Sequence, residues 1–164
     1  MPTIAVITPV YATPENGRLN FLYPTLRSVS AQSQGNYDLV HIIIDDGSTA
    51  NVQSFLRIHG CSNVRYIRRE KTSSDLVGAS NAINFGLEYC LDRNLNVLTR
   101  KEANDLYAIT ILHSDDLLTQ DSIKIRMSLL EDSFVHTKMA SFDNKGRIIK
   151  IRKGENPLEL GNIN

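Results

Sequence analysis

The sequence predicts an α/β fold built on a mostly parallel sheet. Short runs rich in β-branched residues alternate with longer segments of helical periodicity, which is the pattern of successive βαβ units. The run 38–44 is almost continuously apolar, as expected for a strand whose sheet is covered on both faces. With 164 residues, 41% of them apolar, the chain is long enough for one globular core.

The first half of the chain is expected to hold three strands and two helices. The strands are placed at residues 3–8, closed by Pro9, and at 38–44 and 64–67. One helix should run from 23 to 34, because Pro24 suits a first helical turn. The other should be short, capped by Ser48 or Thr49 and stopping near His59, with Gly60 just after it.

The second half begins with the clearest helical pattern of the chain, at residues 78–91. Residues 92–105 are polar and predict an irregular surface segment. The remaining expected elements are a strand at 106–112, a helix at 120–132, and a hairpin with strands at 135–142 and 147–151 around a turn at 143–146.

Composition and charge exclude several classes of protein. Lys plus Arg and Asp plus Glu number 18 each, so there is no basic excess to indicate a nucleic-acid partner. Cys61 and Cys90 lie far apart without the close spacings of a zinc site, and two reduced thiols are expected. No apolar stretch approaches the length of about 18 residues that a transmembrane helix needs, and no signal peptide is evident. We therefore expect a cytoplasmic protein.

Polar residues, most of them acidic, follow three of the expected strands. Tyr11 follows the first strand, Asp45 and Asp46 end the second, and Asp115 and Asp116 follow the strand at 106–112. Ligands of open parallel sheets bind beyond the carboxyl ends of the strands, where such loops converge. Gathered carboxylates repel one another unless a cation or hydrogen-bond donors offset their charge, and oxygen-rich clusters suit Mg²⁺ or Mn²⁺. The pattern indicates a metal–phosphate site.

Five segments, in order, resemble family-2 glycosyltransferases of the GT-A fold. The family pattern I-I-P-V-Y-N is matched by Ile4-Ala5-Val6-Ile7-Thr8-Pro9-Val10-Tyr11, and S-L-x-S-V-L-x-Q by Leu26-Arg27-Ser28-Val29-Ser30-Ala31-Gln32. The pattern V-V-D-D-G-S-T is matched by Ile43-Ile44-Asp45-Asp46-Gly47-Ser48-Thr49. Further along, G-x-S-x-A-R-N is matched by Gly78-Ala79-Ser80-Asn81-Ala82-Ile83-Asn84, and D-x-D-D-L-L by His113-Ser114-Asp115-Asp116-Leu117-Leu118. The resemblance covers roughly residues 3–150. It implies a Rossmann-like, three-layer α/β/α sandwich.

The resemblance also implies how the nucleobase of a donor would bind. Tyr11, close to Pro9, would stack its ring on a uracil. Asp46 would accept a hydrogen bond from the base N3–H, and Asp45 would support the same loop. Ser114 would lie near the ribose.

The DxD-like segment would hold the divalent metal, Mn²⁺ or Mg²⁺, that bridges the two phosphates. Asp115 matches the metal-binding aspartate, and Asp116 is the candidate if the register is off by one. Two positions depart from the family. His113 replaces the first DxD aspartate and could contact the ribose or the metal, and Ile83 replaces an arginine. Arg68, Arg69 or Lys71 could supply the missing cation.

The implied activity is the inverting, metal-assisted transfer of a sugar from a nucleotide sugar, expected to be a UDP-sugar, to a hydroxyl acceptor, as in polysaccharide synthesis. None of Asp143, Glu155 and Glu159 has a context that marks it as the catalytic base. We expect one domain over residues 1–164 that lacks much of the acceptor-binding half. The alternative is a non-catalytic or truncated nucleotide-sugar-binding module that needs a partner. A receiver-type phosphoacceptor domain and a dinucleotide-binding domain are disfavoured, because the first strand is followed neither by an acidic pair nor by GxGxxG.

Overall fold

The computed structural model describes residues 1–61, 63–71, 78–92, 95 and 97–130, together with the backbone of 139–142 and 148–152. The chain divides into two compact units, Met1–Asp121 and Ser122–Asn164. That both belong to a single domain stays a prediction. Across the residues that the structure describes, every helix is too short or too polar to cross a membrane.

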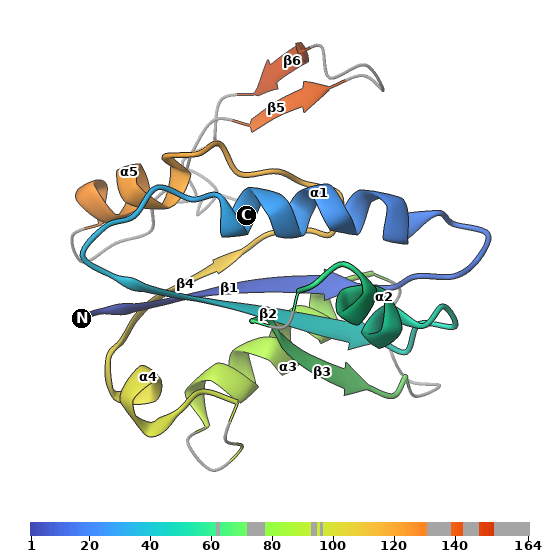
Figure 1. Cartoon of the computed structure of the whole chain (residues 1–164), viewed down its shortest axis with the longest axis horizontal. Coiled ribbons are helices and arrows are strands. Elements are labelled where there is room, and N and C mark those ends of the chain that lie inside the picture. The colour runs from blue at the N-terminus through green and yellow to red at the C-terminus, as the bar shows by residue number, and fades with distance from the viewer. Residues whose placement is uncertain are drawn as a thin grey trace, which may run out of the picture. The chain divides into compact units, whose positions relative to one another are not determined.

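The first unit is built on a four-stranded parallel sheet, in the order β3-β2-β1-β4 (Figure 1). The strands are β1 (Thr3–Val10), β2 (Asp38–Asp46), β3 (Arg65–Arg69) and β4 (Leu106–Ile111). β1 pairs with β2 along its whole length and places Val10 opposite Asp45. The parallel order confirms the α/β class predicted from the sequence.

Helices cover both faces of this sheet, which confirms the three-layer, Rossmann-like architecture (Figure 1). The helices are α1 (Arg18–Ser30), α2 (Val52–Ile58), α3 (Ser80–Leu91) and α4 (Arg100–Asn104). On one face α1 and α2 pack on alternate strand residues, and the cluster contains Val10, Leu22, Leu26, Ile43, Val52 and Leu56. On the other face α3 packs on the intervening residues, and the cluster contains Ala5, Ile7, Ile42, Ile44, Ala82 and Cys90. Alternate strand side chains point to opposite faces, so β1 and β2 supply both cores.

The second unit contains α5 (Ser122–Leu129) and the antiparallel pair β5 (Met139–Phe142) and β6 (Ile148–Arg152). Met139 lies opposite Arg152. The expected pairing of two strands is confirmed, while the turn at 143–146 and the expected strand start at 135–138 lie outside the described residues.

The helix placed at 23–34 is wrong at both ends, because α1 runs from Arg18 to Ser30. Its start is set locally: the Asn16 side-chain oxygen accepts from the Arg18 N–H at 3.0 Å. Pro24 lies inside the helix rather than in its first turn. Leu22 is fully buried, so burial of the extra turn stabilises the earlier start.

Two further expectations need correction. The cap of α2 is Asn51, whose side chain accepts from the Ser54 N–H at 2.8 Å, and neither Ser48 nor Thr49 caps it. The segment 92–105 is not irregular throughout, because α4 begins with a capping box formed by Thr99 and Glu102. That box is visible in the sequence as Thr-x-x-Glu and was missed because no apolar periodicity follows it. The predicted role of Gly60 after α2 is supported by its φ of 66°.

Candidate functional site

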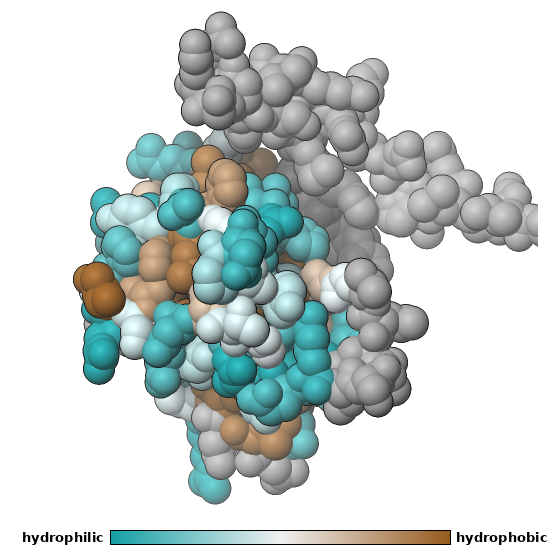
Figure 2. Space-filling model, turned by 90° about the vertical axis from the view of Figure 1, so that its right-hand side faces the viewer, coloured by the Kyte–Doolittle hydropathy of each residue, from teal (hydrophilic) through white to brown (hydrophobic). Residues whose placement is uncertain are grey.

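The carboxyl ends of β1, β2 and β4 meet at one edge of the sheet. β1 lies between the other two strands, and neighbouring strands are about 4.8 Å apart, so the ends of β2 and β4 are roughly 10 Å apart. Each end is followed by residues singled out in the sequence. Figure 2 views the molecule from this edge, and the described surface there is mainly hydrophilic.

Asp45, at the end of β2, is a fully buried carboxylate with three internal donors. It accepts from the Ser48 N–H at 2.9 Å, the Tyr66 hydroxyl at 2.6 Å and Arg68 Nη1 at 3.1 Å. Burial and the hydrogen bond to Asp45 raise the pKa of Tyr66 to about 12, which keeps its hydroxyl protonated as a donor. These contacts tie Asp45 to β3 and to the loop after β2.

Asp46, the next residue, points to a different set of partners. Its side chain is 5% exposed and accepts from Arg69 Nε. Its other oxygen lies 3.4 Å from Lys71 Nζ. The same Nζ lies 3.8 Å from the centre of the Tyr11 ring, as in a cation–π contact. Lys71 Nζ therefore contacts both Tyr11 and Asp46, the two residues predicted to bind the base.

The loops after β1 and β2 are tied together by backbone contacts. The Ala12 N–H donates to Ser48 Oγ at 2.9 Å, and the Ala50 N–H donates to the Ala12 carbonyl at 3.0 Å. Gly47 has a φ of 70°, which favours glycine, and a Cβ there would lie 3.3 Å from Lys71 Cγ. Pro9 is buried inside β1 and acts as part of this frame.

The loop after β4 is fixed to helix α1. Thr25 is fully buried, and its Oγ1 lies 3.0 Å from the Ser114 carbonyl and 2.9 Å from the Asp116 carbonyl. Ser114 is buried, whereas His113 is exposed and its carbonyl accepts from the Asp116 N–H at 3.0 Å. The loop is thus held by its backbone, and the carboxylates of Asp115 and Asp116 are left at the surface.

These two carboxylates are exposed and adjacent. Partial desolvation of the carboxyl by the surrounding loop, together with the neighbouring charge of Asp115, raises the pKa of Asp116. Asp115 accepts a hydrogen bond from Arg18 Nη1, at the start of α1. Within the described part of the chain, no group of three or more His, Cys, Asp or Glu side chains is placed to hold a metal. A Mg²⁺ or Mn²⁺ held by only two carboxylates would need water or phosphate oxygens as its remaining ligands.

Several residues of this site were not singled out in the sequence, because each acts across a long sequence separation. Tyr66 reaches Asp45 across 21 residues, Thr25 reaches the β4 loop across about 90, and Arg18 reaches Asp115 across 97. The candidate cations Arg68 and Arg69 prove to be bound to the two β2 aspartates.

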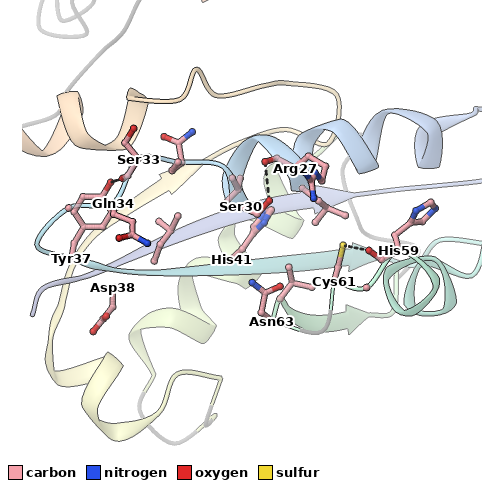
Figure 3. A pocket seen from close by; sticks show the side chains of 17 residues that line it. Arg27, Ser30, Ser33, Gln34, Tyr37, Asp38, His41, His59, Cys61 and Asn63 are labelled. Atoms are coloured by element: carbon pink, nitrogen blue, oxygen red, sulfur yellow. Dashed lines mark hydrogen bonds between the residues drawn. The ribbon is translucent and has the colours of Figure 1, made fainter.

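A separate cavity of about 510 Å³ lies toward the opposite end of the sheet, between the C-terminal part of α1 and the segment after α2 (Figure 3). Its lining includes Arg27, Tyr37, His41 and Cys61. His41 is buried, lies 2.8 Å from Thr8 Oγ1 through Nε2, and burial lowers its pKa to about 4. None of the predicted site residues lines this cavity.

A parallel sheet covered by helices on both faces is a Rossmann-like architecture, in which ligands bind beyond the carboxyl ends of the strands. The family model of glycosyl transferase family 2 matches residues 5–159, and the chain belongs to this family. This confirms the resemblance seen in the sequence. No curated protein matches the chain.

Similar solved structures include three of TarS from S. aureus: a form of residues 1–349, TarS itself, and the 1–349 form in complex with UDP. Each has 15% sequence identity, covers 78% of this chain and gives a TM-score of 0.51. The chain spans 32%, 19% and 31% of those chains, respectively. At this level of identity the likeness concerns the fold.

Proposed function

We propose that this chain binds a nucleotide sugar, of which UDP-sugars are the best candidates, and transfers its sugar to a hydroxyl acceptor. The observation that carries the proposal is the meeting of the Tyr11 ring and the Asp46 carboxylate at Lys71 Nζ. An aromatic face beside a buried carboxylate matches a uracil, which offers a flat ring for stacking and an N3–H donor. The UDP complex of TarS supports this choice of base.

Binding a base on this face of Tyr11 requires Lys71 to move from the ring. Asp46 then exchanges the ammonium of Lys71 for the base N3–H and keeps its contact with Arg69. Lys71 is 39% exposed, so water compensates for much of the charge contact that it loses.

The phosphates would lie toward the loop after β4. There Asp115 and Asp116 would hold a divalent cation, Mn²⁺ or Mg²⁺, together with the diphosphate oxygens. Such a cation supplies positive charge where negative charge develops on the departing diphosphate. Buried Ser114 and exposed His113 lie on the same loop, at the predicted ribose side.

In the proposed transfer the acceptor oxygen attacks the anomeric carbon, which inverts its configuration. The bond from that carbon to the diphosphate breaks, and its electron pair leaves with UDP. The acceptor proton passes to a general base. The three acids considered for this role in the sequence, Asp143, Glu155 and Glu159, lie outside the described residues.

Isothermal titration with UDP and CDP, with and without Mn²⁺, tests the donor site. Asp46→Asn is expected to weaken UDP binding about tenfold to a hundredfold and to reduce the preference for UDP over CDP, because the N3–H loses a charged acceptor. Asp115→Ala should remove the effect of Mn²⁺. Asp38→Asn is the matched control, because this aspartate pairs with Lys101 at the other end of β2.

A folded protein that binds no nucleoside diphosphate would refute the proposal. UDP binding without acceptor-dependent release of UDP from a UDP-sugar would favour the alternative, a non-catalytic nucleotide-sugar-binding module.

A further inference from the structure

Arg18 connects two elements that are far apart in the sequence. It is the first residue of α1, and its Nη1 donates to Asp115 Oδ2 in the loop after β4. Both side chains are 42% exposed, so the ion pair lies at the surface of the site rather than in its frame. An exposed pair of this kind contributes little to stability, which leaves the guanidinium available for another partner.

The other cationic side chains at this edge of the sheet already contact groups outside the loop after β4. Arg69 is 12% exposed and bound to Asp46, and Arg68 is bound to Asp45 and to Glu70. Lys71 lies on the base side, against Tyr11 and Asp46. Within the described part of the chain, Arg18 is the basic side chain that contacts the DxD-like loop, and only its Nη1 has a described hydrogen bond. Its Nε and Nη2 groups can donate to a ligand.

We propose that Arg18 binds the diphosphate of the donor, next to the cation held by Asp115. This inference rests on the proposed function and adds a residue to it. A guanidinium offers parallel N–H donors that match two phosphate oxygens, and it stays charged at every working pH. Asp115 positions the guanidinium through Nη1, and the remaining donors face the phosphates. Arg18 thereby provides positive charge at the diphosphate that does not depend on the metal.

Titration of UDP and of uridine into the full chain separates the phosphate contact from the base contact. Arg18→Met is expected to weaken UDP binding about tenfold to a hundredfold, both with Mn²⁺ and in EDTA, and to leave uridine binding unchanged. Arg18→Lys should retain part of the affinity, because it keeps the charge but loses the paired donors. Arg27→Met is the matched control, since Arg27 is an exposed arginine of the same helix at the other cavity, and it should bind UDP like the wild type.

Three results would overturn the assignment. UDP affinity that is unchanged in Arg18→Met would show that the guanidinium does not contact the phosphates. If Arg18→Met binds UDP more tightly than the wild type does in the presence of Mn²⁺, Arg18 merely competes with the metal for Asp115. An equal loss for UDP and uridine would show that the substitution disturbs the site as a whole. If the wild type binds neither ligand, the proposed function itself fails, and that result is distinct from the other three.

Discussion

Asp45→Ala is expected to destabilise the protein by about 3–5 kcal/mol, because two donors inside the fold lose their charged acceptor. The carboxylate is fully buried and accepts from the Ser48 amide at 2.9 Å, the Tyr66 hydroxyl at 2.6 Å and Arg68 at 3.1 Å. Alanine leaves the amide and the hydroxyl without an acceptor, and each hydrogen bond to a charged group contributes about 1.5–3 kcal/mol. Arg68 is 41% exposed, so water takes over part of its interaction.

Urea unfolding followed by circular dichroism measures this loss as a lower midpoint at an unchanged slope. Tyr66→Phe removes one of the three donors and should cost about 1.5 kcal/mol. Asp38→Ala, at the half-buried start of β2, should change the free energy of unfolding by less than about 0.5 kcal/mol. If Asp45→Ala stays within about 1 kcal/mol of the wild type, the carboxylate is not what holds the loop after β2.

Two further predictions concern the interior of the first unit. Burial lowers the pKa of His41 from 6.5 to about 4, so the unfolded chain binds a proton at this side chain more readily than the folded protein does. The free energy of unfolding should therefore fall by up to about 3 kcal/mol as the pH drops from 6.5 to 4. Urea titrations at pH 7 and 4.5 measure this difference in the free energy of unfolding. If His41→Gln shows the same pH dependence as the wild type, other groups cause it. Gly86→Ala should cost about 1–3 kcal/mol, because a Cβ would lie 2.9 Å from Ile7 Cγ2 and 3.0 Å from Ile44 Cγ1. The thermal midpoint of Gly86→Ala is compared with that of Asn84→Ala, a control on the exposed side of the same helix. Equal midpoints for the two variants would contradict the tight packing around Gly86.

Most of the fold of the first unit could be predicted because its signals are local. The β-branched runs that form β1 and β2 are largely apolar on both faces, a pattern typical of a covered parallel sheet. Boundaries were less certain where side chains act as caps. α1 starts five residues before the predicted position because Asn16 bonds the Arg18 amide, and α4 was missed although Thr99 and Glu102 form its capping box.

The candidate site was predicted as a set of strand ends, and the topology brings those ends to one edge of the sheet. The family resemblance assigned the two β2 aspartates different roles, and only the structure shows the partners of each. Asp45 turns inward to Tyr66, and Asp46 turns to Arg69 and Lys71, because successive side chains of a strand point to opposite faces. That difference gives Asp45 its partners on β3 and the loop after β2, and places Asp46 beside Lys71 and Arg69.

The sequence by itself determined the fold class, the family and the loops that form the candidate site, because hydrophobic periodicity and short motifs are properties of neighbouring residues. The tertiary structure alone decided which charges meet. The contacts of Arg18 with Asp115 and of Lys71 with Tyr11 join residues separated by 97 and 60 positions. Such pairs depend on strand order and helix placement, which arise when the whole core packs and which no local pattern encodes.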